Sequence, residues 1–282
     1  MRRLVLCVLV ALTVNAAHAQ AGALRPLVPV PLAYGPNLMQ FGLLRVPAGP
    51  GPHPVAVLVH GGCWSPGGNV AFMEPLSLAL AQAGIATWNV EYRKVGDLGG
   101  GYPNTLTDVG RATDKLRELA GPFGLDLDRV AAVGHSAGGQ LAVWAAARDG
   151  GDPLPLAGVV SLAGVLDLAA YHPVDILKDP ITQWTCSMFV DPFMGGSPAS
   201  VPDRYAAASP IALVPIGVRQ HVLHGTADTT VPVSYSERYA AAATAAGDDV
   251  TLTRLEGAGH FDLITPHPAV MSAVAAAVGG QP

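Results

Sequence analysis

Six short apolar runs recur along this chain, and segments with helical spacing separate most of them. The run at residues 54–62 is continuously apolar and ends in glycines, which is typical of a parallel strand buried on both faces. A chain that alternates strand and helix in this way forms a mostly parallel sheet with helices on both faces. The expected strands are residues 54–62, 85–93, 129–136, 156–167, 219–228 and 249–260, and the expected helices are residues 107–120, 136–148, 232–247 and 268–279.

The chain of 282 residues, half of them hydrophobic, is long enough for a single large α/β domain, which we expect over residues 20–282. Residues 38–47 predict an early antiparallel strand at the sheet edge. Residues 168–210 contain neither a clean strand nor a long helix, and they hold aromatic and methionine side chains among prolines and aspartates. Long insertions of this kind are usually functional. We interpret this one as a lid over the site, and a surface segment with its own small core is the alternative.

The first 19 residues have the pattern of a secretory signal peptide cut after Ala19. Arg2 and Arg3 precede a short apolar run, and a small-x-small site follows it. An uncleaved membrane anchor is the alternative. The net charge is −5, and it becomes about −7 once these two arginines are removed. The sequence therefore predicts an exported protein, periplasmic or secreted, without nucleic-acid partners or stable membrane insertion.

Two cysteines remain after the signal peptide, since Cys7 lies within it. An even pair in an exported protein can form a disulfide. Spacing does not show whether Cys63 and Cys186 meet, so a disulfide and two free buried thiols both stay open.

Ser136 lies in a Gly-x-Ser-x-Gly motif between an expected strand and an expected helix. This is the setting in which the motif presents a nucleophile on a sharp turn. The alternative is that Ser136 only caps the helix. A serine hydroxyl is a weak nucleophile and needs a base within hydrogen-bonding reach.

His260 is the best candidate for that base, because it follows the last expected strand in the glycine-bounded stretch "GAGHF". An ordinary surface-loop histidine is the alternative. Asp228, at the end of another strand, is the best candidate for the acid that orients the base. Asp167 competes with it, and Asp262 lies too close to His260 in sequence.

An oxyanion formed at the site needs backbone N–H donors. The stretch "HGGCW" (60–64) ends the first core strand, so the amides of Gly62 or Cys63, together with that of Ala137, are the expected donors. Trp64 would line the acyl pocket, or pack under the insertion instead.

The chain resembles an α/β-hydrolase of the esterase/lipase superfamily over nearly all of residues 20–282. The motifs "HGGCW", "EYR" (91–93), "GHSAGG" (134–139), "HGTADTTVP" (224–232) and "GAGHF" (257–261) stand in that superfamily's order, and the acid and base follow Ser136 in that order too. The form of "HGGCW" is similar to that of small carboxylesterases, acetyl-xylan or feruloyl-type esterases and arylformamidases. Residues 136–260 also resemble the catalytic domain of prolyl-oligopeptidase-type peptidases. We interpret Arg93 and Asp108 as structural partners beside the site.

These motifs predict a serine hydrolase that cleaves small carboxylic esters through Ser136, His260 and Asp228. Cleavage of an amide, as in an arylformamidase or small peptidase, is the alternative, and a non-catalytic binding protein is a third possibility. No metal or nucleotide motif is apparent, so we expect no cofactor. The acyl and alcohol groups and the oligomeric state stay open.

Overall fold

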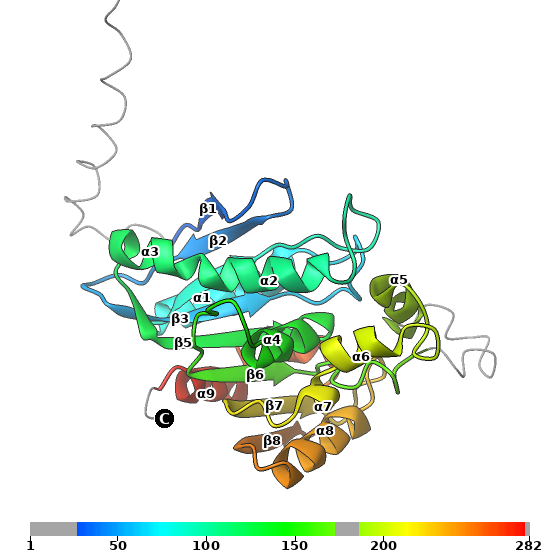
Figure 1. Ribbon diagram of the computed structural model, residues 1–282. Helices are drawn as coiled ribbons and strands as arrows, with labels where there is room; N and C mark the ends of the chain where they lie inside the picture. Colours follow the sequence, from blue (N-terminus) through cyan, green and yellow to red (C-terminus); the bar gives the residue numbers. More distant parts are fainter. Residues whose placement is uncertain (1–26, 173–185, 280–282) are drawn as a thin grey trace, which may run out of the picture.

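The computed structural model describes residues 27–172 and 186–279, which build an eight-stranded sheet with helices on both faces (Figure 1). The strand order is β1-β2-β4-β3-β5-β6-β7-β8. β1 and β2 pair antiparallel with their neighbours, and all other pairs are parallel. The strands are β1 (Val30–Ala33), β2 (Phe41–Arg45), β3 (His53–Val59), β4 (Ala86–Val90), β5 (Leu125–His135), β6 (Gly158–Leu162), β7 (Arg219–Gly225) and β8 (Val250–Leu255).

The central strands are apolar on both faces because helices cover both faces. In β3, Val55 and Val57 contact one apolar cluster, whereas Ala56 and Leu58 contact the other. Side chains of a strand point alternately to its two faces, so a continuous apolar run fills both layers at once. This confirms the predicted mostly parallel sheet.

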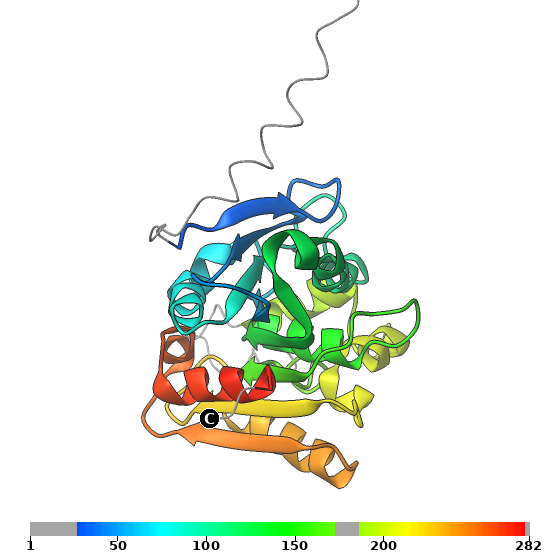
Figure 2. The same ribbon diagram turned by 90° about the vertical axis from the view of Figure 1, so that its left-hand side faces the viewer.

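Two helices cover one face of the sheet and the others cover the opposite face. Figure 2 shows α1 and α9 on one side and α2 to α4 on the other. The longer helices are α1 (Glu74–Gln82), α2 (Asn104–Asp114), α3 (Leu116–Phe123), α4 (Ala137–Ala147), α8 (Ser234–Ala245) and α9 (Pro268–Ala277), and the short 3₁₀ segments are η1 (Val70–Met73), η3 (Cys186–Phe189) and η4 (His260–Ile264).

The predicted insertion is described only in part, because residues 173–185 lie outside the described residues. The predicted signal peptide, residues 1–19, also lies outside them. The remaining part of the insertion carries the short helices α5 (Val190–Met194) and α6 (Pro202–Ala208), and α7 (Pro210–Leu213) begins at its last residue. Val190, Phe193 and Met194 are fully buried and belong to the main apolar cluster. The described part of the insertion therefore packs onto the domain core.

Several element bounds differ from the predicted ones. β5 begins four residues early, since Leu125 pairs with His53 of β3. β6 ends at Leu162, because Ala163 has a φ of 49° that breaks the extended backbone. The single helix expected over residues 107–120 is two helices, α2 and α3.

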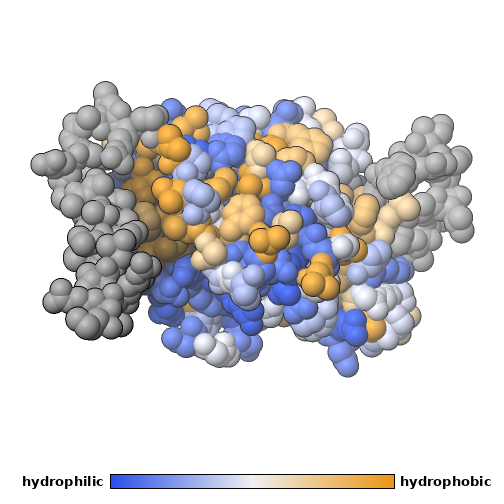
Figure 3. Space-filling view, turned by 90° about the horizontal axis from the view of Figure 1, so that it is seen from above, coloured by the Kyte–Doolittle hydropathy of each residue, from blue (hydrophilic) through white to orange (hydrophobic). Residues whose placement is uncertain are grey.

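The surface seen from the β1 edge mixes hydrophobic and hydrophilic residues (Figure 3). Val28, Val30 and Leu38 are among the exposed large hydrophobic residues of the chain. None of the helices in the two described ranges has the length and hydrophobicity needed to cross a membrane.

Candidate active site

Ser136 occupies a sharp turn at the centre of the sheet. β5 ends at His135 and α4 begins at Ala137, and Ser136 between them has a φ of 56° and a ψ of −122°. A non-glycine residue with positive φ costs energy and persists only where its surroundings hold it. The backbone of Gly138 also approaches Gly134 closely. Position 134 therefore requires glycine, because a Cβ there would overlap the carbonyl oxygen of Gly138.

The Ser136 hydroxyl is buried and has no hydrogen-bond partner in the part of the chain that the structure describes. Its side chain makes no capping bond to α4, so the helix-cap interpretation is wrong. A buried hydroxyl normally has a partner, and one without it calls for an explanation. A strained turn that presents an unbonded hydroxyl is the arrangement expected of a nucleophile.

His260 and Asp228 form a close buried pair. Nδ1 of His260 lies 2.6 Å from Oδ2 of Asp228. The other carboxylate oxygen accepts the amide N–H groups of Thr230 and Val231 at 2.8 and 2.9 Å. Because Asp228 is an acceptor, Nδ1 carries the hydrogen, and Nε2 is left with a free lone pair that can accept a proton. Nε2 has no hydrogen-bond partner among the described residues.

A second histidine contacts the same carboxylate oxygen. Nε2 of His224 lies 3.2 Å from Oδ2 of Asp228 and 2.8 Å from the carbonyl oxygen of Val231, while its Nδ1 contacts Ser236. Burial alone would raise the pKa of Asp228, but the hydrogen bonds from His224 and His260 outweigh it and hold that pKa below its usual range. Asp228 therefore stays ionised beside His260.

The competing carboxylates face elsewhere. Asp167 accepts the amide of Ala170 and pairs with Arg238 at 3.2 Å. Asp262 accepts the amide of Gly259. Of these three aspartates, Asp228 is the one that the structure brings to His260.

His135 joins the His260 loop to the turn that carries Ser136. Its ring centroid lies 4.6 Å from that of His260, and its Nε2 is 2.9 Å from the His260 carbonyl oxygen. Burial, with a smaller contribution from His260, lowers the pKa of His135 to about 3. His135 is therefore neutral near pH 7 and donates Nε2–H to that carbonyl. This contact holds the loop of the expected base against the residue that precedes Ser136.

The low pKa of His135 predicts a pH effect on stability. An unfolded histidine takes up a proton below about pH 6.5, whereas folded His135 stays neutral down to about pH 3, so its contribution is full above pH 6.5 and declines as the pH falls. His135→Gln keeps a donor near the position of Nε2 but does not titrate. Between pH 6.5 and 4.5, we expect the unfolding free energy of the wild type to fall more steeply than that of His135→Gln, by up to about 1.4 kcal/mol per pH unit. Urea titrations at several pH values measure both slopes, and parallel slopes would contradict the assignment.

The predicted oxyanion donors have free backbone amides in the described part of the chain. The amides of Gly62, Cys63 and Ala137 donate no hydrogen bond to any described residue. Gly61 lies against Ser136, since a Cβ added to Gly61 would be 2.9 Å from that of Ser136.

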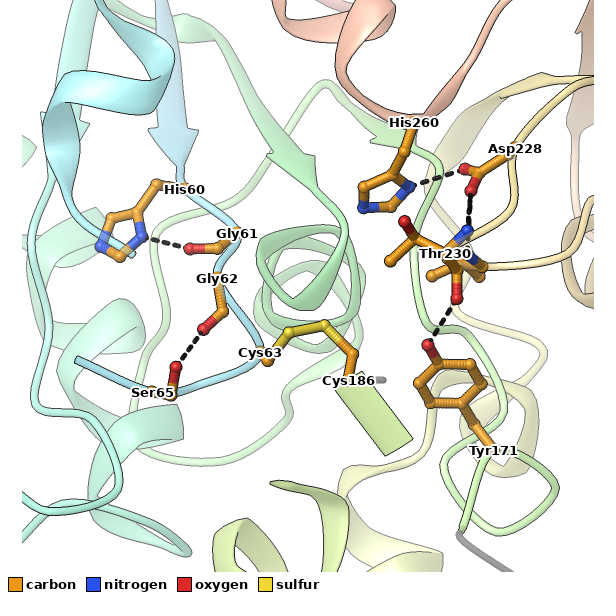
Figure 4. The surroundings of a disulfide bond; sticks show 11 residues. His60, Gly61, Gly62, Cys63, Ser65, Tyr171, Cys186, Asp228, Thr230 and His260 are labelled. Carbon is orange, nitrogen blue, oxygen red and sulfur yellow. Dashed lines mark hydrogen bonds and ion pairs between the residues drawn. A yellow bond between two sulfur atoms is a disulfide. The ribbon is translucent and has the colours of Figure 1, made fainter. Parts of the chain in front are cut away.

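Side chains hold the carbonyl groups of Gly61 and Gly62. Nδ1 of His60 lies 2.7 Å from the Gly61 oxygen, and the Ser65 hydroxyl donates to the Gly62 oxygen at 2.8 Å (Figure 4). In a trans peptide the C=O and the following N–H point in opposite directions. The amides of Gly62 and Cys63 therefore point away from the side chains that bind these carbonyl groups.

His60 is itself held by a buried carboxylate from the "EYR" stretch. Its Nε2 lies 2.9 Å from Oε1 of Glu91, which also accepts from Lys94 at 2.5 Å. Burial would raise the pKa of Glu91, but the hydrogen bonds from His60 and Lys94 lower it to about 2. As predicted, Arg93 and Asp108 are structural partners, joined by two side-chain bonds of 2.6 and 2.7 Å.

Trp64 has no exposed surface and packs inside the domain. Its Nε1 donates to Gln140 at 3.0 Å, and its ring stacks on Phe193 of α5 with centroids 4.8 Å apart. This arrangement corresponds to packing under the insertion. Trp64 has no free face that could line an acyl pocket, so the structure lends no support to that role.

Cys63 and Cys186 form a disulfide, with Cα atoms 4.9 Å apart (Figure 4). This decides between the two alternatives that the sequence left open. The bond joins the turn after β3 to the start of η3 in the insertion. Near the start of the insertion, the hydroxyl of Tyr171 donates to the carbonyl oxygen of Thr230, two residues after Asp228.

Sequence reasoning missed the contacts of His224 and His135. The position of His135 beside Ser136 could have signalled its role, since the base must approach that turn. His224 precedes Asp228 by four residues, which is a weak signal. Among the described residues, no three His, Cys, Asp or Glu side chains group in a way that could hold a metal ion.

The BD-FAE family model matches residues 44–242, more than two thirds of the chain. The chain belongs to the BD-FAE family. BD-FAE proteins are esterases of the α/β-hydrolase fold. The match to this family includes Ser136 and Asp228 and ends before His260.

Relatives of this BD-FAE chain include two curated proteins. It is 32% identical over 216 residues to "Esterase LipQ" of Mycobacterium tuberculosis, covering 74% of this chain and 51% of that protein. It is 28% identical over 229 residues to the "Probable isoprenylcysteine alpha-carbonyl methylesterase ICME" of Oryza sativa subsp. japonica, covering 77% of this chain and 54% of that protein. The chain thus spans about half the length of these relatives.

A solved structure, titled "Bacterial Heroin Esterase", is similar to this BD-FAE chain with a TM-score of 0.70. The identity is 24%, and the match covers 89% of this chain and 82% of that one. This likeness shows the α/β-hydrolase fold.

Proposed function

We propose that this protein is a carboxylesterase that works through an acyl-enzyme on Ser136. The observation that supports this proposal most strongly is the contact of His135 with the loop of His260. This contact holds the His260–Asp228 pair against the turn that carries the unbonded Ser136 hydroxyl. The names of the curated relatives support ester cleavage over other hydrolytic reactions.

In the proposed reaction, Nε2 of His260 takes the proton of Ser136 while Oγ attacks the acyl carbon. The amides of Ala137 and of Gly62 or Cys63 donate to the oxyanion that forms. His260 then gives its proton to the leaving alcohol, and it activates the water that releases the acyl group. Asp228 keeps His260 in the tautomer that can accept a proton and stabilises the imidazolium.

Amide cleavage is the second candidate, because the same residues could attack a formamide or peptide bond. We expect the ester to be preferred. Initial rates on p-nitrophenyl esters from acetyl to octanoyl, beside N-formylkynurenine, test this. The expected result is fast turnover of short-chain esters with little formamide cleavage. Dominant formamide cleavage would contradict the carboxylesterase assignment.

We also propose that the protein is exported. The signal-peptide pattern of residues 1–19 supports this, and so does the Cys63–Cys186 bond, because disulfides persist in oxidising compartments. Sequencing the N-terminus of the protein from cell fractions tests it. The expected start is Gln20, in the periplasmic or secreted fraction, and a cytoplasmic chain that keeps residues 1–19 would contradict export.

A further inference from the structure

The turn that holds two of the expected oxyanion donors has an unusual backbone. Gly62, Cys63 and Trp64 are consecutive, and their φ angles are 109°, 58° and 54°. Glycine adopts positive φ freely, but Cys63 and Trp64 do so at a cost. Such residues keep this conformation only where their surroundings impose it.

Each residue of the turn is held by a different contact. The Gly62 oxygen accepts from the amide and hydroxyl of Ser65 at 3.0 and 2.8 Å. The Trp64 carbonyl oxygen accepts a hydrogen bond from the amide of Val95. The Trp64 ring is held by its hydrogen bond to Gln140 and its stacking on Phe193. Cys63 is held through its side chain by the disulfide to Cys186.

The disulfide and the Trp64 stack lead to the same short segment of the insertion. Cys186 begins η3, and α5 follows it directly and carries Phe193. Phe193 is fully buried, and its carbonyl oxygen accepts the amide of Tyr102. The segment Cys186–Met194 therefore has its own attachment to the domain and can serve as a rigid support for the turn.

We propose that the Cys63–Cys186 disulfide is a positioning element that keeps the Cys63 amide aimed at the oxyanion, so that full turnover requires the oxidised protein. This inference rests on the proposed esterase function. When the bond is cut, Cys63 loses its covalent link to η3 and its backbone can relax from the left-handed region. The amide then no longer points consistently at the oxyanion, while Ser136, His260 and Asp228 keep their contacts.

Reduction of the folded wild type is the first test. Dithiothreitol transfers two electrons and two protons to the bond, which leaves two cysteine thiols and the cyclic disulfide of the reagent. Loss of one oxyanion donor typically costs about 10²–10³ in kcat, and a donor that is only misaligned should cost less. We expect kcat on p-nitrophenyl acetate to fall about 10-fold with KM little changed, and to return on reoxidation.

The Cys186→Ser variant is the second test, since it removes the bond but leaves every residue of the turn in place. We expect the same loss in kcat, and no further effect of dithiothreitol. A trifluoromethyl ketone forms a hemiketal whose oxyanion occupies the same place as that of the intermediate. Its Ki should therefore rise by the factor by which kcat/KM falls, which a merely structural role would not require.

Three results separate the outcomes. Folded Cys186→Ser protein with kcat and Ki within twofold of the wild type would overturn this inference and leave the esterase assignment standing. A wild type without ester turnover would contradict both. If Cys186→Ser does not fold, the double variant Cys63→Ala with Cys186→Val replaces it, because this variant removes both sulfurs and places only apolar side chains at the two positions. Unfolding of this variant and of the reduced protein as well would show that the bond holds the fold rather than the turn.

Discussion

Replacing Ser136 with alanine is expected to lower kcat for ester hydrolysis by at least ~10⁴-fold, because the acyl-enzyme can no longer form. Weak turnover should remain, since the oxyanion donors and His260 are still present and can assist the attack of water. The loss should appear in kcat for every ester, whatever its chain length.

The same change should leave the fold intact. The Ser136 hydroxyl has no hydrogen-bond partner among the described residues, so its removal leaves none of their polar groups unsatisfied. Alanine also meets the same backbone strain as serine at a φ of 56°. We therefore expect a Tm equal to or slightly above that of the wild type.

Ser161 provides a matched control. It is buried on the neighbouring strand β6, and its hydroxyl also has no hydrogen-bond partner within residues 27–172 and 186–279. Ser161→Ala should keep its activity and its labelling by a fluorophosphonate, whereas Ser136→Ala should lose both. A Ser136→Ala protein that kept most of its turnover would contradict the mechanism.

Replacing Asp228 with asparagine should be the next most damaging change, with a loss in kcat of about 10³–10⁴-fold. An asparagine amide can donate to Nδ1 of His260, which places the imidazole hydrogen on Nε2. The nitrogen that must accept the proton of Ser136 is then blocked. The shape of the site should change little, because the two side chains have almost the same size.

Asp167→Asn is the control for this prediction, because Asp167 follows the neighbouring strand β6 in sequence and pairs with Arg238 instead of His260. We expect its kcat to stay within twofold of the wild type. Steady-state kinetics on p-nitrophenyl acetate compare the two variants, with circular dichroism to check folding. If Asp167→Asn lost activity and Asp228→Asn did not, the acid would have to be reassigned.

Local signals were enough to predict the central part of the fold and one side-chain contact of the candidate site. The apolar run that became β3 and the glycine-rich stretch around Ser136 each carry their structure in a few adjacent residues. The contact of His260 with Asp228 also follows from the pattern, because the two residues stand in the loops that follow β7 and β8, which are paired parallel strands.

Features that depend on distant residues could not be predicted in the same way. Cys63 and Cys186 are 123 residues apart in sequence, and nothing in their neighbourhoods shows that they meet. The early start of β5 depends on pairing with β3, and the packing of Trp64 depends on Phe193 far along the chain.

The geometry of the Ser136 turn also limits which nucleophiles this site could accept. A β-branched side chain is strongly disfavoured at positive φ, so threonine should not fit at position 136 without distorting the turn. Cysteine has the same unbranched shape as serine and meets no such obstacle. The backbone conformation thus restricts the nucleophile at this position to a thiol or a primary alcohol and excludes a secondary alcohol.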